Sequence, residues 1–215
     1  MTYKAIIFDL DGTLVNSIYD IADAMNTVLK QRNYPTFDYD TYKTFVGHGV
    51  KRLIEEAIPQ NHLSDTLVNA CLSEMMHTYS ESCTNKTKPY DGILSLLNSL
   101  HDQGVKLSVL SNKEDTLTKK VVRALLPQCL NPVLGLKEEA LKKPNPKVAL
   151  QICSALNVTP EETIYVGDSN VDMQTAKRAN MKAVGVSWGF RDKKELVEAG
   201  ADYILHKPMD LLKIL

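Results

Sequence analysis

The sequence predicts an α/β protein: a parallel sheet with helices on both faces, interrupted by a helical insertion. From Val105 onward, short apolar runs alternate with helical stretches, which is the order that a parallel sheet requires. An earlier apolar run at residues 4–9 is typical of a strand covered on both faces. Residues 17–83 contain helical patterns and no convincing strand. The first strand can therefore join the later ones only if this helical stretch is inserted after it.

The elements are expected in the following order. Apolar residues at helical spacing predict a helix from Ile18 to before Pro35, and Ser17 with Asp20 is typical of a capping box that starts it. A turn at 47–49 leads to a second helical face at 50–57, and a third helix is expected at 63–79. Beyond a polar linker at 84–89, helices are expected at 93–100, from about 116, at 147–156, 171–180 and 193–199, with a helix start at 159–162. Strands are expected at 105–110, 132–136, 163–166, 182–187 and 201–205.

Composition excludes several classes of protein. The chain has 215 residues, enough for one domain with a sizeable insertion. Lys and Arg number 25 and Asp and Glu 26, so the basic excess of a nucleic-acid binder is missing. No apolar run approaches the length of a membrane span, and residues 1–8 do not resemble a signal peptide. The four cysteines have no metal-ligand spacing, so we expect a cytoplasmic protein with reduced thiols.

Polar segments follow four of the expected strands, at the edge where open parallel sheets bind ligands. In the first, Asp9 and Asp11 lie two residues apart, so both carboxylates face one spot. Two such charges favour a hard cation between them, and Mg²⁺ is the simplest choice. The turn at Gly12 lets backbone N–H groups converge on an anion. A plain Asp-Gly turn would also explain these residues.

The other three segments also allow two interpretations. Asp168 ends a strand and Asp172 lies in the next helical turn, where it could merely form a capping box with Ser169. Ser111 could hold a phosphate at a helix N-terminus, or form only a capping box with Glu114. Lys143 could neutralise an anion or be a solvated surface lysine. Together, several carboxylates, a serine and a lysine at strand ends are the components that phosphoryl transfer requires.

In order and spacing, these segments resemble the four motifs of the haloacid dehalogenase superfamily. They are Asp9-x-Asp11-Gly12-Thr13, Ser111, Lys143, and Gly167-Asp168-x-x-x-Asp172. The resemblance implies a Rossmann-like three-layer core at residues 1–15 and 83–215, with a small α-helical cap at 16–82. Further likeness to phosphoglycolate-phosphatase-like members comes from the segments at 8–17, Phe45-Val46-Gly47-x-Gly49 and Pro89-Tyr90-x-Gly92.

The resemblance also implies a mechanism. Asp9 would be the nucleophile that forms an aspartyl-phosphate, and Asp11 the general acid and then the base. Mg²⁺ would be held by Asp9, the backbone carbonyl of Asp11 and Asp168, with Asp172 in support. The phosphoryl group would be bound by Leu10, Gly12, Ser111, Asn112 and Lys143. His48 would lie in a cap loop over a small anionic phosphorylated substrate, or be only a surface residue.

Alternatives remain open at this point. Relatives with this pattern also hydrolyse pyrophosphate or sugar phosphates, and a phosphomutase would share the motifs. A phospho-aspartate signalling domain and a catalytically silent binding protein represent different classes. We expect no nucleic-acid or membrane partner, and either a monomer or a homodimer.

Overall fold

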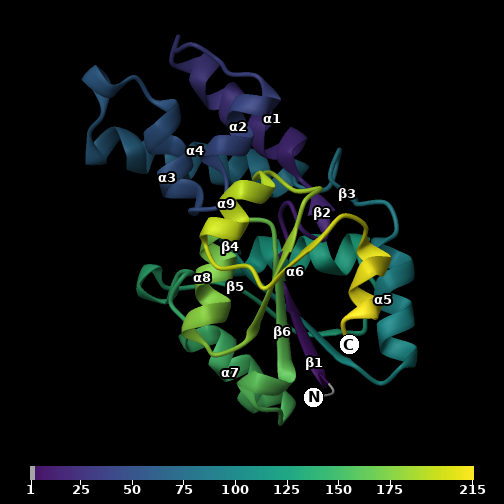
Figure 1. Cartoon of the computed structure of the whole chain (residues 1–215). Coiled ribbons are helices and arrows are strands. Elements are labelled where there is room, and N and C mark those ends of the chain that lie inside the picture. The colour runs from purple at the N-terminus through teal and green to yellow at the C-terminus, as the bar shows by residue number, and fades with distance from the viewer. Residues whose placement is uncertain (1–2) are drawn as a thin grey trace.

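The fold is centred on a parallel sheet, seen in a computed structural model that describes residues 3–215 (Figure 1). Six strands lie in the order β5-β4-β1-β6-β7-β8, and all neighbours are parallel. They are β1 (Ala5–Phe8), β4 (Lys106–Glu114), β5 (Leu130–Leu136), β6 (Thr163–Gly167), β7 (Lys182–Val186) and β8 (Tyr203–Leu205). The predicted α/β class is confirmed. Residues 1 and 2, which fall in the expected core range, lie outside the described residues.

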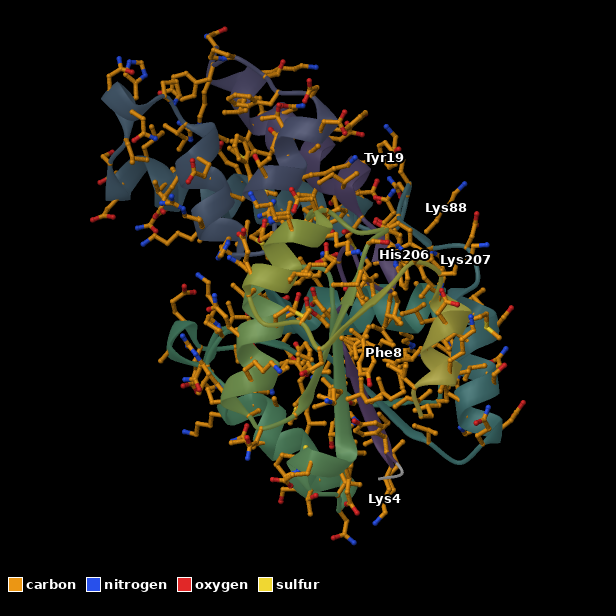
Figure 2. The ribbon with its side chains drawn as sticks, viewed as in Figure 1. Lys4, Phe8, Tyr19, Lys88, His206 and Lys207 are labelled. Atoms are coloured by element: carbon orange, nitrogen blue, oxygen red, sulfur yellow. The ribbon has the colours of Figure 1, made fainter. Side chains whose placement is uncertain are left out.

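Helices cover both faces of the sheet because side chains alternate along each strand. Ile6 and Phe8 of β1 pack on the face covered by α5 and α6, whereas Ile7 packs on the face covered by α7, α8 and α9. These helices are α5 (Ile93–Asp102), α6 (Asp115–Leu125), α7 (Lys147–Leu156), α8 (Asn170–Arg178) and α9 (Lys193–Glu198). Figure 2 shows Phe8 among the side chains at the centre, and Lys4 at the opposite end of β1, pointing outward. The apolar run at 4–8 thus forms a strand buried on both sides.

Four further helices follow β1 and gather beyond the carboxyl ends of the strands (Figure 1). They are α1 (Ile18–Gln31), α2 (Tyr39–Phe45), α3 (Val50–Ala57) and α4 (Asp65–Ser82), with a single 3-10 turn η1 (Gln60–His62). Helix α4 packs against both α1 and α3. The sequence pattern did not predict α2, which has one buried residue, Tyr42. Its local signal is the N-cap, where Asp38 accepts a hydrogen bond from the N–H of Thr41 at 2.8 Å.

A short ribbon joins the four-helix segment to the sheet. Strand β2 (Val15–Asn16) pairs antiparallel with β3 (Lys88–Pro89), inside the expected linker at 84–89. The carboxylate of Asp20 accepts hydrogen bonds from the N–H groups of Lys86 and Thr87, at 3.0 and 2.8 Å. Ser17 makes no side-chain cap, so the predicted capping box is wrong because Asp20 binds the returning chain instead. Tyr19 and Lys88 mark this junction in Figure 2.

The remaining differences from the expected elements are small. The helix start expected at 159–162 is a single 3-10 turn, η3 (Pro160–Glu162), which leads directly into β6. Two other 3-10 segments are η2 (Glu139–Leu141) and η4 (Pro208–Lys213). Within residues 3–215, every helix is too short or too polar to cross a membrane.

Candidate active site

The first motif lies at the carboxyl end of β1, in the middle of the sheet. Asp9 follows the last strand residue, and the chain then turns at Gly12, whose φ is +86°. A Cβ atom on Gly12 would lie 2.1 Å from an oxygen of Asp168, so no larger residue fits this turn without displacing that carboxylate. Leu10 is fully buried, and its carbonyl accepts hydrogen bonds from the turn, including one from the N–H of Leu14 at 3.0 Å. The group of Leu10 that can bind an anion is therefore its backbone N–H.

Three carboxylates from two strand ends form a buried acidic cluster. Asp9, Asp168 and Asp172 each place an oxygen within 4.8 Å of the others. Burial, followed by the charge of Asp172, raises the pKa of Asp9 to about 7. Burial and the charges of Asp9 and Asp172 also raise the pKa of Asp168 well above its usual range. Oδ1 of Asp9 is buried without a hydrogen-bond partner. An all-oxygen site with excess negative charge fits a hard divalent cation such as Mg²⁺.

Lys143 is buried beside this cluster. Its Nζ lies 2.8 Å from Oδ1 of Asp9, outside hydrogen-bond geometry, and donates to Asp172 at 2.7 Å and to the carbonyl of Leu110 at 3.2 Å. Burial opposes its charge, but the two carboxylates raise the pKa of Lys143 above the usual value. Asp172 also accepts from the N–H of Ser169 at 3.1 Å. Asp172 therefore caps α8, as the capping interpretation predicts, and also pairs with Lys143. Its support of a metal ion stays a prediction.

Asp11 lies apart from the acidic cluster and pairs with a lysine that sequence analysis did not single out. Both of its oxygens accept from Lys113, at 2.6 and 2.7 Å. The same ammonium lies 5.0 Å from the ring centre of Tyr79 on α4, whose hydroxyl is buried without a hydrogen-bond partner. Lys113 could have been found from its place at a strand end beside Ser111. Tyr79 gave no such signal, because only tertiary packing brings α4 over the sheet edge.

The second motif closes the site from β4. Ser111 is buried, and its Oγ accepts from the N–H of Lys113 at 3.2 Å. The alternative in which Ser111 caps the next helix is wrong, because Glu114 is the N-cap of α6 and accepts from the N–H of Leu117 at 2.9 Å. Ser111 is thus left facing the site.

Asn112 connects three parts of the chain. Its Oδ1 accepts from the N–H of Lys143 at 2.9 Å, and its Nδ2 donates to the carbonyl of Gly47 at 3.1 Å. The side chain therefore fixes the loop that carries the buried lysine and touches the turn between α2 and α3.

A cavity of about 80 Å³ separates the sheet edge from the four-helix segment. Such a volume holds only a few water-sized groups. The sheet-edge wall is polar and includes Asp9, Asp11, Ser111, Asn112, Lys113 and Lys143. The helical wall is largely apolar and includes Ile21, Val46, Val50, Leu53, Met75, Met76 and Tyr79. The cavity therefore has a polar wall at the sheet edge and an apolar wall on the helical side.

His48 lies outside this inner cavity. It lines a wider cleft on the outer side, together with Lys51, Arg52 and Lys142. Burial and then the cations of Arg191 and Lys142 lower the pKa of His48. The structure thus places His48 in this outer cleft and not in the lining of the cavity that Asp9 and Asp11 share.

The fold is an α/β fold in which buried carboxylates follow two neighbouring parallel strands, β1 and β6. Residues 6–186 match the family model of haloacid dehalogenase-like hydrolases. The chain belongs to the haloacid dehalogenase-like hydrolase family and is a phosphatase of that superfamily.

Comparison with individual proteins shows which branch of this family the chain resembles. The chain is 32% identical to a phosphoglycolate phosphatase of Aquifex aeolicus, over 99% of this chain and 96% of that protein. It is also 32% identical to one of Colwellia psychrerythraea, over 97% and 95% of the two chains. A crystal structure of a predicted phosphoglycolate phosphatase from Haemophilus somnus has a TM-score of 0.89 and 28% identity, and the match covers 100% of this chain and 98% of that one. The predicted family and its phosphoglycolate-phosphatase-like branch are confirmed.

Proposed function

We propose that this phosphatase is Mg²⁺-dependent and hydrolyses a small phosphomonoester, with phosphoglycolate favoured, through an aspartyl-phosphate on Asp9. The observation that carries the proposal is the position of Asp9, which belongs to the acidic cluster, lies beside Lys143 and lines the small cavity. Residues 1–15 and 83–215 then form the catalytic core and residues 16–82 the cap.

In this proposal Mg²⁺ is held by Asp9, Asp168 and the backbone carbonyl of Asp11, with Asp172 in support. The charge count of the cluster supports it, because three buried carboxylates face the single ammonium of Lys143. The raised pKa values of Asp9 and Asp168 are consistent with this excess of negative charge. When bound, the metal supplies positive charge that stabilises the phosphoryl oxygens.

The first half-reaction is proposed to split the ester. A carboxylate oxygen of Asp9 attacks phosphorus as the bond to the leaving oxygen breaks, and Asp11 gives that oxygen a proton. Lys143 and Ser111 bind the phosphoryl oxygens, with backbone N–H groups at Leu10, Gly12 and Asn112. The products are an alcohol and the aspartyl-phosphate.

The second half-reaction is proposed to restore the enzyme. Asp11, now a carboxylate, takes a proton from a water molecule while the oxygen of that water attacks phosphorus. The bond between phosphorus and the Asp9 oxygen breaks. Inorganic phosphate leaves, and Asp9 is again a carboxylate. Covering of the cavity by the helical segment keeps other water away during the first step.

A small leaving group with an anionic end fits this site best. The cavity is small, and Lys113 adjoins Asp11, the proposed acid for the leaving oxygen. The carboxylate of phosphoglycolate would meet the ammonium of Lys113. Pyrophosphate is the second candidate, because a second phosphate would meet the same ammonium.

A substrate panel tests the proposal. The protein is assayed with Mg²⁺ against phosphoglycolate, pyrophosphate, sugar phosphates including β-glucose 1-phosphate, and an aryl phosphate, with an EDTA-treated control. We expect turnover of phosphoglycolate that EDTA abolishes. Conversion of the glucose 1-phosphate to the 6-phosphate would indicate a mutase, and a long-lived phospho-aspartate without turnover would indicate a signalling role. A folded protein that turns over none of these compounds would refute the proposal.

A further inference from the structure

The loop after β7 reaches from the sheet to the four-helix segment through Arg191. One guanidinium nitrogen, Nη2, donates to the carbonyls of Thr44 at 2.9 Å and Val46 at 2.8 Å. Nη1 donates to the carbonyl of Lys43. These carbonyls lie at the C-terminal end of α2, where the helix dipole favours a cation. Only 11% of the Arg191 side chain is exposed, so this contact is well shielded from solvent.

The same loop is fastened to the acidic cluster on its other side. The N–H of Phe190 donates to Asp168 at 2.7 Å, and Nε1 of Trp188 donates to the carbonyl of Thr13 at 3.0 Å. A Cβ atom on Gly189 would lie 2.2 Å from Cβ of Asp168. The backbone therefore approaches this carboxylate more closely than any other residue type would allow. The loop that carries Arg191 is thus hydrogen-bonded to the segments that follow β1 and β6.

The segment that Arg191 holds is the one that closes the cavity. Val46, Gly47, Gly49 and Val50 line it, and the turn at Gly47 also receives the hydrogen bond from Asn112. The hydrogen bonds of Arg191 toward this segment go to main-chain carbonyls, which remain the same whatever side chains the segment carries. Such bonds can hold the segment in place without contacting a substrate.

We propose that Arg191 is a positioning residue that fastens residues 43–46 to the core when the four-helix segment closes over the cavity. The loop at 188–191 then couples closure to the orientation of Asp168, because one rigid stretch makes both contacts. The kinetic part of this inference rests on the proposed phosphatase function, whereas the closure itself does not. Product release would require these hydrogen bonds to break.

Three variants test the proposal: Arg191→Ala, Arg191→Lys and, as a matched control, Lys194→Ala. Lys194 is on α9, 83% exposed, and pairs only loosely with Glu198 at 3.8 Å. Its loss therefore removes a nearby charge without touching the four-helix segment. Lysine at 191 retains the charge but cannot meet three carbonyls with the planar fork of arginine.

The first measurement is hydrogen exchange of backbone amides in the full-length protein. In Arg191→Ala we expect the amides of residues 43–46, which donate the last hydrogen bonds of α2, to exchange about tenfold faster, with the buried strands β1 and β6 unchanged. Lys194→Ala should match the wild type, and Arg191→Lys should lie between. Unchanged exchange at 43–46, or an equal increase throughout the chain, would overturn the proposal.

The second measurement is kcat/KM for the best substrate of the panel. We expect a loss of about 10- to 100-fold in Arg191→Ala, since misplacement of the cavity wall disturbs the reacting geometry. Partial recovery is expected in Arg191→Lys.

If the wild type hydrolyses nothing, the proposed function fails, but the exchange comparison still decides whether Arg191 holds the segment closed. If Arg191→Ala does not fold, Arg191→Lys and Glu195→Ala replace it, since Glu195 lies 3.5 Å from Nε of Arg191. Wild-type exchange in both would overturn the proposal.

Discussion

The sheet edge and the four-helix segment meet across one small cavity, yet they contribute opposite kinds of groups. The edge presents ionisable side chains in fixed pairs, such as Lys143 with Asp172 and Lys113 with Asp11. The helices present apolar side chains and one partnerless hydroxyl, that of Tyr79. Charged groups need rigid partners to remain buried, whereas apolar groups can slide and repack. Under the proposed function, we therefore expect the sheet edge to perform the chemistry and the helices to select the substrate.

The largest effect should come from the nucleophile. Asp9→Asn removes the attacking oxygen, so we expect activity to fall by about 10⁴-fold or more. Thermal stability should stay the same or rise, because a buried carboxylate with a raised pKa is lost. Steady-state assays and thermal unfolding measure the two effects. Asp40→Asn on α2, an 87% exposed carboxylate, is the control and should behave as the wild type.

The next largest effect should come from the pair at the edge of the cavity. Lys113→Met leaves Asp11 without its cation, and we expect kcat/KM for phosphoglycolate to fall by about 10²-fold. The loss for a phosphate ester with an uncharged leaving group should be smaller. Parallel assays of Lys137→Met, which removes a 63% exposed lysine, provide the baseline. Equal losses for both esters would contradict the proposed contact between Lys113 and the leaving group.

A change on the helical side should act on binding rather than chemistry. Tyr79→Phe removes the buried hydroxyl, so KM should rise by about two- to tenfold if that hydroxyl binds substrate, with kcat little changed. The free energy of unfolding should increase by about 1 kcal/mol, since an unsatisfied polar group is removed. Tyr203→Phe, at an exposed position on β8, is the matched control. A large fall in kcat with unchanged KM would show that Tyr79 takes part in the chemical steps. That result would contradict the proposed contrast between the sheet edge and the four-helix segment.

The smallest effect should come from a carboxylate remote from both regions. Burial opposes the charge of Asp202, but hydrogen bonds from Lys177 at 2.7 Å and the N–H of Ala183 at 2.8 Å lower its pKa. A lowered pKa in the folded state stabilises the protein above the unfolded value of about 3.9, and this contribution is lost as pH falls. Asp202→Asn should therefore reduce the free energy of unfolding by about 1 kcal/mol at pH 7. The difference should shrink toward pH 3 in urea unfolding, and a constant difference would contradict the assignment.

Two capping patterns show how far local sequence can be trusted. Ser169 with Asp172 forms the predicted box although Lys143 also binds Asp172, because Lys143 takes Oδ1 and leaves Oδ2 for the N–H of Ser169. Ser17 with Asp20 has the same pattern, but Asp20 binds the chain returning at Lys86 and Thr87. The pattern is local in both cases, whereas the competing partner is 66 residues away in the second. The Ser17–Asp20 prediction therefore failed because a segment far away in the sequence binds Asp20.

The sequence by itself determined the parallel sheet, the insertion after the first strand and the four polar strand ends. Each of these depends on periodicity or on residues close together in the chain, so its physical cause is local. Tertiary structure decided that Asp11 pairs with Lys113, that Tyr79 faces that pair, and that Arg191 holds the end of α2. Those contacts join segments far apart in the chain, and side-chain packing and the need to pair buried polar groups select them only after the sheet has formed.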